Sequence, residues 1–220
     1  MVSTFHKPDA SAFRLISTVC KEINVPNSIL ACVVLTLVSI PAAFLVAGEA
    51  PPPKPGDVVF QTNFDTPQER DAWSKAEFAQ WEPGYEGTTS LSVTAPAERA
   101  KGGSMISMPL DLAPYRGYRL LFECMAKAEE VSKPSETYLG AKFMLHYQSR
   151  ESGPFWQNQN GVFGTFDWRK LRFTARIAPD ATGGQLNLGL QDSSGEVSFD
   201  AIRVTVFKGP PPKRPDPPAN

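Results

Sequence analysis

Residues 185–206, QLNLGLQDSSGEVSFDAIRVTV, decide the fold. Leu186, Leu188 and Leu190 occupy every second position between polar residues, which is the period of a strand with one buried face. A Ser-Ser-Gly turn then leads into a second alternating run. The same period occurs in three earlier runs, at 118–127, 142–148 and 170–177. Strands of this kind form antiparallel sheets with one covered face, so we predict an all-β fold: a two-sheet antiparallel β-sandwich of the jelly-roll type.

The C-terminal run, at 197–206, changes phase in its middle. Phe199 belongs to one parity of apolar positions and Ile202 belongs to the other. A β-bulge at residues 200–201 would keep both side chains buried, and it would turn Asp200 out of the regular ladder. One helix is predicted, over residues 66–75, with Thr66 or Asp65 as its N-cap.

Composition excludes several classes of function. The chain of 220 residues has 22 basic and 23 acidic side chains, and a balance this even argues against nucleic-acid binding. Its two histidines, His6 and His146, are too few for a histidine-rich zinc site. Its three cysteines exclude a disulfide framework.

Residues 1–50 contain a targeting or anchoring segment. The run at 29–46, ILACVVLTLVSIPAAFLV, carries no charge, and basic residues precede it. A signal peptide is the first interpretation, which predicts a secreted protein, extracellular or periplasmic. The alternative is an uncleaved membrane anchor that leaves the rest of the chain outside the cell.

Proline-rich stretches bracket the predicted domain. Residues 51–55 form a short spacer, residues 56–208 form the β-sandwich, and residues 209–220 form a second Pro-rich linker or tail. Because such spacers usually join folded units, we expect a further domain to be missing beyond this tail.

Two groups of residues are candidates for a binding site. Flat aromatic faces can cover the apolar side of a sugar ring, and amides can bond its hydroxyl groups. Residues 153–161, GPFWQNQNG, provide both, and we expect them to form a loop between strands. The candidates in it are Phe155, Trp156, Gln157 and Gln159. The alternative is a polar Ω-loop whose aromatic side chains pack into the end of the sandwich.

The second candidate is the polar face of the strands. It would combine Lys142, His146 and Gln148 with Glu123, Arg172, Asn187 and Gln191. Gly189 would let a flat ring approach the backbone of this face. The alternative is an ordinary solvated outer face, which produces the same alternation.

Several stretches resemble carbohydrate-binding modules of the family 4/9 type, which have a galactose-binding-like jelly roll. The matching stretches are VVFQTNFDT at 58–66 and residues 163–206, which end in FDAIRVTV. Residues 131–149 and 161–168 resemble more narrowly the module that precedes the catalytic barrel in some bacterial family 5 glycoside hydrolases. In related modules a tryptophan at the position of Trp168 packs under the sheet.

The resemblance also implies a structural calcium ion. Asp65 and Asp200 lie near the ends of the first and last predicted strands, which would be neighbours in this fold. Two carboxylates with loop carbonyl groups can hold calcium. This sequence departs from the usual pattern, because Ala201 stands where a second aspartate is frequent.

The resulting hypothesis is an exported, non-catalytic carbohydrate-binding module that assists polysaccharide hydrolysis. Its partner would be a β-glucan, a xylan or a mannan, stacked on Trp156 or Phe155 with hydroxyls held by Gln157, Gln159, His146 or Asn187. One alternative is the N-terminal part of a family 5 type glycoside hydrolase whose catalytic domain is missing here. The other is a structural or adhesive cell-surface module without a sugar ligand.

Overall fold

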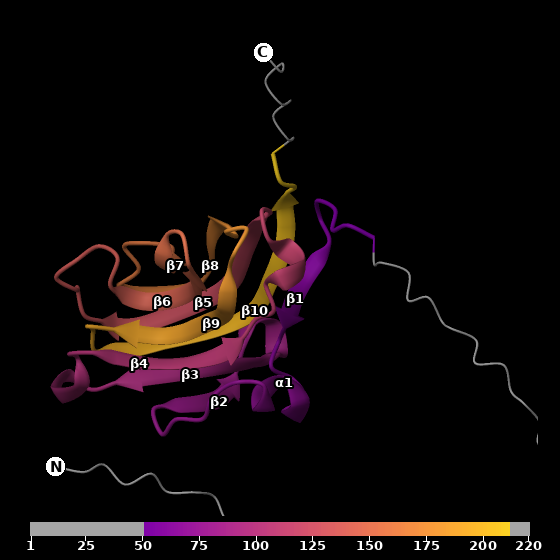
Figure 1. The fold of residues 1–220 in the computed structure, drawn as a ribbon. Helices are drawn as coiled ribbons and strands as arrows, with labels where there is room; N and C mark the ends of the chain where they lie inside the picture. The colour runs from indigo at the N-terminus through magenta and orange to yellow at the C-terminus, as the bar shows by residue number, and fades with distance from the viewer. Residues whose placement is uncertain (1–50, 212–220) are drawn as a thin grey trace, which may run out of the picture. The chain divides into compact units, whose positions relative to one another are not determined.

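The structure is a computed structural model that describes residues 51–211. These residues form two antiparallel sheets packed face to face (Figure 1), so the predicted β-sandwich of jelly-roll type is confirmed. Within this part of the chain, no helix is long and apolar enough to cross a bilayer. The apolar run at 29–46 and residues 212–220 of the tail lie outside the described residues, so export and anchoring stay predictions.

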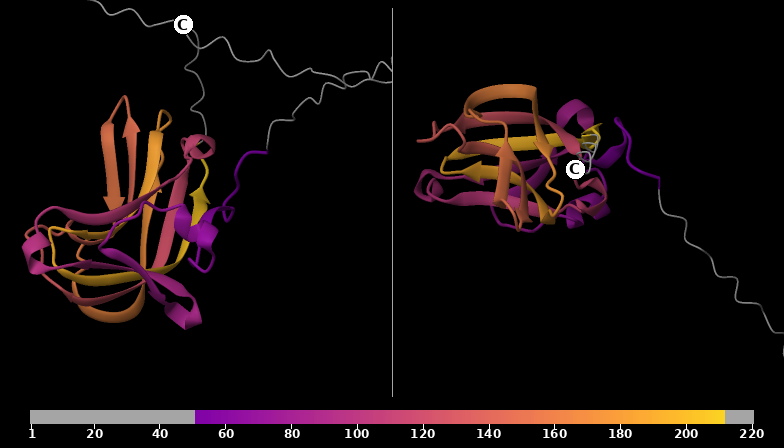
Figure 2. Two further views of the ribbon diagram at one scale, coloured as in Figure 1. Left: turned by 90° about the horizontal axis from the view of Figure 1, so that it is seen from below. Right: turned by 45° about the horizontal axis from the view of Figure 1, so that its top comes forward.

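The larger sheet has the strand order β2-β3-β10-β5-β8, and β1 also pairs with β10. Its six strands are β1 (Val58–Thr62), β2 (Ala79–Pro83), β3 (Thr89–Ala95), β5 (Arg119–Val131), β8 (Gly164–Arg176) and β10 (Gly195–Lys208). Figure 1 shows β1 beside β10 at the end of the sandwich where the described chain begins and ends, and Figure 2 shows the same arrangement from two further sides.

The smaller sheet has the order β4-β9-β6-β7. Its strands are β4 (Gly103–Pro109), β6 (Gly140–Ser149), β7 (Gly153–Asn158) and β9 (Thr182–Gln191). Only β6 and β9 have a neighbour on both sides, because β4 and β7 are the edge strands. The alternating apolar positions of both sheets face each other and form the core.

Three phenylalanines lie at the centre of that core. Phe122 of β5 stacks on Phe173 of β8, with ring centroids 4.7 Å apart, and Phe143 of β6 meets both rings edge-on. Leu186 and Leu188 of β9 are fully buried against the same cluster. The side chains predicted to face inward therefore join the two sheets, and their burial supplies the main stabilising force of the fold.

Two local predictions can be compared directly with the structure. The register of β10 against β5 slips by one residue between Asp200 and Arg203, and Ala201 has a φ of 47°, so the predicted bulge is confirmed. The one α-helix among residues 51–211, α1 (Pro67–Asp71), is shorter than predicted. Thr66 is its N-cap and forms a reciprocal capping box with Glu69, whose hydrogen bonds with Thr66 lower the pKa of the Glu69 carboxyl.

Candidate functional site

The outer face of the smaller sheet carries amide, sulfur and aromatic side chains together with one lysine. Along β6 and β9, every second residue faces the core and the residues between them face outward. The outward residues form cross-strand pairs: Lys142 with Gly189, Met144 with Asn187, His146 with Gln185, Met144 with Asn158, and His146 with Trp156. The predicted candidates Lys142, His146, Asn187 and Trp156 are therefore brought together on one face.

A groove of about 470 Å³ opens on this face. Strands β4, β6, β7 and β9 and the loop before β6 all contribute to it. Its lining residues are Met105, Tyr138, Lys142, Met144, Trp156, Gln157, Asn158, Asn160 and Gln191. Among the residues that the structure describes, the lining combines two aromatic rings with four amides and contains no Asp or Glu.

Trp156 is the most prominent ring of the groove. It is 56% exposed, and its indole stacks on the imidazole of His146 with centroids 3.6 Å apart and planes 15° apart. One face of the indole is thus supported and the other is open. Edge strand β7 fixes this arrangement, because Trp156 and His146 are direct cross-strand partners.

Both ring nitrogens of His146 are already engaged. Nδ1 lies 2.9 Å from the carbonyl oxygen of Phe155, and since a carbonyl can only accept, Nδ1 carries the proton. Nε2 then accepts from the Gln148 amide at 3.2 Å. His146 is consequently a positioning residue beneath Trp156 and has no free nitrogen for a ligand hydroxyl.

Lys142 lies in the floor of the groove and is only 2% exposed. Its ammonium group donates to the carbonyl oxygen of Tyr138 and lies 3.4 Å from Oδ1 of Asn158. Burial lowers the pKa of Lys142 to about 8, and the charge of Asp192 opposes this shift.

Asn187 is buried on the same face, between Ser107 of β4 and Met144 of β6. Its Nδ2 has no hydrogen-bond partner in the part of the chain that the structure describes. A buried amide without a partner is unfavourable, so this atom is a donor that a ligand could satisfy.

The prediction that residues 153–161 form a loop was wrong for most of the segment, because residues 153–158 pair with β6 as β7. Alternation then separates the predicted site residues. Phe155 turns inward and stacks on Tyr147 with centroids 4.6 Å apart, so it offers no stacking surface to the groove. Oε1 of Gln159 accepts the backbone N–H of Arg172 in β8 at 2.8 Å, which links the two sheets and occupies that oxygen. Gln157 lines the groove and donates to the carbonyl of Asn158.

Other members of the predicted polar face lie on the opposite sheet. Glu123 and Arg172 belong to β5 and β8, and Glu123 forms an ion pair with Lys170 at 3.6 Å.

Trp168 does not pack in the core as expected; it is half-buried and meets Tyr85 edge-on. Gly189 does not serve to admit a ring, because a Cβ there would overlap the carbonyl oxygen of Ser104 in β4.

The predicted calcium ligands Asp65 and Asp200 lie near the bulge in the middle of β10, and Asp200 is fully buried. Oδ2 of Asp200 accepts the backbone N–H of Tyr85 and lies 2.5 Å from the Thr88 hydroxyl, while Oδ1 accepts the N–H of Ala201. Burial is the largest influence on the Asp200 carboxyl and raises its pKa. Oδ1 of Asp65 accepts the N–H of Thr89. Donors surround these carboxylates where calcium would need oxygen ligands, so the residues present do not fit the ion.

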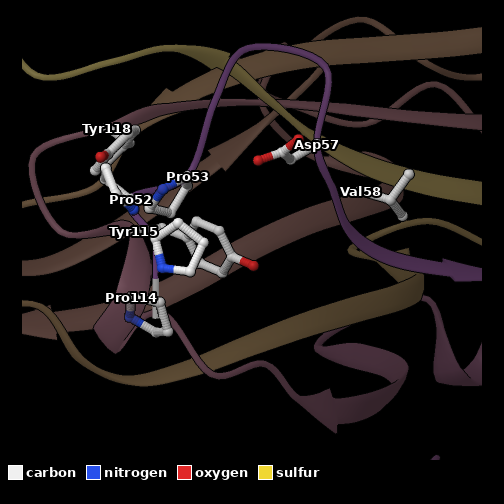
Figure 3. Close-up of a pocket in the computed structure, with 8 residues that line it drawn as sticks. Pro52, Pro53, Asp57, Val58, Pro114, Tyr115 and Tyr118 are labelled. Atoms are coloured by element: carbon white, nitrogen blue, oxygen red, sulfur yellow. The ribbon is translucent and has the colours of Figure 1, made fainter. Parts of the chain in front are cut away.

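A larger pocket, of about 1040 Å³, lies at the end of the domain where the described chain begins. Figure 3 shows Pro52 and Pro53 of the spacer beside Tyr115 and Tyr118. Asp57 in this lining already accepts the N–H of Lys54. Since the spacer itself forms one wall and no amide side chain lines this pocket, it is a weaker candidate for sugar binding than the groove.

Sequence reasoning did not single out Tyr138 or Met105. Tyr138 is 54% exposed in the loop before β6, where no periodic signal marks its direction. Asn158 lies in the predicted aromatic-amide segment, but its place beside Met144 depends on the pairing of β7 with β6, which the sequence does not display.

Comparisons with known proteins concern the fold. No family model and no curated protein matches the sequence. Among solved structures, the tandem CBM22-1–CBM22-2 domain of Paenibacillus barcinonensis Xyn10C aligns with 78% of this chain at 18% identity and a TM-score of 0.56. This chain spans about half of that protein, 51%.

Two single modules align over nearly their whole length. The CBM22-1 xylan-binding domain of the same Xyn10C is 17% identical, with 71% of this chain and 98% of that chain covered and a TM-score of 0.52. The C-terminal family 22 carbohydrate-binding module of Clostridium thermocellum Xyn10B is 18% identical, with 70% and 96% covered and a TM-score of 0.52. The chain therefore has the jelly-roll fold of carbohydrate-binding modules, whereas the narrower family 4/9 assignment is not confirmed.

Proposed function

We propose that residues 56–208 form a non-catalytic carbohydrate-binding module that holds a β-linked polysaccharide in the groove of the smaller sheet. The observation that carries this proposal is the lining of the groove, to which the exposed indole of Trp156 and the amides of Asn158 and Gln191 all contribute. A pyranose ring presents an apolar face and a rim of hydroxyl groups, and this lining is complementary to both.

The chemistry of the lining also supports binding without bond cleavage. Glycoside hydrolysis in most enzymes needs two carboxyl groups on either side of the scissile bond. The described lining has none, and its titratable groups are Tyr138 and Lys142.

We propose a xylan-type polymer as the first ligand to test, because one of the similar folds, the CBM22-1 domain of Xyn10C, is described as a xylan-binding domain. We further propose that the chain is exported and assists a polysaccharide hydrolase. The uncharged run at 29–46 and the Pro-rich spacers support this part of the proposal. Mass spectrometry of the mature N-terminus distinguishes the two forms of export, because a signal peptide would be absent from the mature chain and an anchor would remain.

Calorimetry or affinity electrophoresis of the full chain against xylan, β-glucan and mannan tests the binding. We expect retention by at least one polymer and an affinity at least about tenfold lower in Trp156→Ala, since a central exposed aromatic residue commonly dominates binding energy. Phe207→Ala is the matched control, because Phe207 is 44% exposed near the end of β10 and outside the groove. Absence of binding to every polymer, or unchanged binding in Trp156→Ala, would contradict the proposal.

A further inference from the structure

Lys142 is a buried cation without an anionic partner. The ion pairs among residues 51–211 join Lys75 with Asp71 and Lys170 with Glu123, so neither involves Lys142. The two oxygens that Lys142 contacts, on Tyr138 and Asn158, are neutral. A buried charge is tolerated at much lower cost when an opposite charge lies against it, and nothing described in the groove provides one.

The surroundings of Lys142 do not neutralise it. Asp192, after the end of β9, acts on Lys142 only at a distance, and its Oδ1 accepts the N–H of Gly102 at 2.8 Å. The other titratable groups around it are Tyr138 on the preceding loop and His146 further along β6. Strands β4 and β7 contribute only neutral groups to this part of the floor, Met105 and Asn158.

Two buried donors on this face have unused hydrogen-bonding capacity. An ammonium group has three N–H bonds, and the neighbouring oxygens account for two of those on Lys142. The Nδ2 of Asn187, diagonally adjacent on β9, is a second donor without a partner. An acceptor on a ligand would satisfy these two donors, and a negatively charged acceptor suits Lys142 best.

We propose that the groove selects polysaccharides that carry carboxylate groups, and that the carboxylate of a uronic acid residue binds the Lys142 ammonium. This inference depends on the proposed function, because it names the class of sugar that the same groove prefers. A general attraction for polyanions does not explain such a preference, since the whole chain has a net charge of −1.

Two polymers that differ only in the carboxyl group provide the test. Calorimetry would compare glucuronoxylan with the same glucuronoxylan after its carboxyl groups have been reduced to alcohols. We expect the full chain to bind the carboxylated polymer at least about tenfold more tightly, as expected for a charge pair in a partly desolvated site. Lys142→Met should bind the two polymers about equally, so the ratio of the two affinities should fall to about one.

Lys127→Met is the matched control, because it removes the same charge from the exposed outer face of the larger sheet. It should retain the preference of the unchanged chain, and dextran sulfate should bind weakly to all three proteins. Equal binding of both xylans by the unchanged chain would overturn this inference and leave the proposed function intact. Binding of neither xylan, nor of any neutral polymer, would overturn the proposed function instead. An equal loss in Lys127→Met would show that long-range charge causes the preference, which also overturns the inference.

A second measurement needs no variant. Because the pKa of Lys142 is lowered to about 8, the preference of the unchanged chain for the carboxylated polymer should decline between pH 7 and pH 9.5. A preference that is the same at both pH values would overturn the inference even if Lys142→Met failed to fold.

Discussion

The two sheets follow the same alternating pattern, but their outward-facing side chains differ in kind and in exposure. On the larger sheet, Lys127, Lys170 and Arg172 are exposed long charged side chains, and one of them is paired with Glu123. On the smaller sheet, Lys142 is 2% exposed and Asn187 is 9% exposed, although both point away from the core. A face that only needs to be solvated has no reason to bury a cation and an unpartnered amide. The difference supports placing the proposed binding site on the smaller sheet.

The largest effect on stability should come from Gly189→Ala, which perturbs the pairing of strands within the smaller sheet. Gly189 has a φ of 144°, and an added Cβ would overlap the Ser104 carbonyl oxygen of the neighbouring strand. Forced separation of β4 from β9, together with an unfavourable φ, should lower the free energy of unfolding by about 3 kcal/mol. Urea denaturation measures this change.

Gly103→Ala is the control for that substitution. It lies in the same strand pair without a positive φ, and its added Cβ would meet only the terminal methyl of Met105 at 3.0 Å. We expect a loss below about 1 kcal/mol, because a flexible side chain can move aside. Similar losses at both glycines would contradict the argument from backbone contact.

Lys142→Met should stabilise the domain, by about 2 kcal/mol at pH 7, because it removes a buried charge without an anionic partner. The pKa of Lys142 is about 8 in the folded chain, against about 10.4 for an unfolded lysine. Between these values the unfolded state binds more protons, so the stability of the unchanged chain rises with pH. The advantage of Lys142→Met should therefore shrink from pH 8 to pH 10.5, as measured by urea denaturation at each pH. An advantage that is constant with pH would show that the lysine is not desolvated.

The sequence predicted most strands and their inward faces well. Burial on one side of a strand imposes a period of two, and this period is visible within a few consecutive residues. Even the bulge at Asp200 was visible, because a one-residue slip lets a single strand bury apolar side chains of both parities. The sequence did not show which strands share a sheet. That depends on pairing between distant segments, so Glu123 and Lys142 were placed on one face although they lie on opposite sides of the sandwich. Strand β7 was missed for the same reason, because its amide-rich residues become a strand only through pairing with β6.

A smaller effect is expected from His146→Ala, which removes the ring beneath Trp156 and leaves Trp156 itself in place. The indole should lose its fixed orientation, because the stacking at 3.6 Å and the hydrogen bond to the Phe155 carbonyl both disappear. We expect polysaccharide affinity to fall about fivefold, close to the value of one aromatic stacking contact. Calorimetry measures this loss, and Gln148→Ala, which removes only the second partner of the imidazole, should lose less. An affinity in His146→Ala as low as that of Trp156→Ala would mean that the imidazole contacts the sugar directly.

The smallest effect should come from calcium. In the larger sheet, the carboxylate of Asp200 is surrounded by the N–H groups of Tyr85 and Ala201 and by the Thr88 hydroxyl, so donors already occupy both of its oxygens. An ion could bind only if these donors turned away, and the bulge at Ala201 would have to rearrange with them. We therefore expect the same melting temperature, within about 1 °C, in millimolar calcium and in excess chelator, because a ligand stabilises only a state that binds it. A rise of several degrees in calcium that disappears in Asp200→Asn would place a metal site at the bulge and give the larger sheet a binding role of its own.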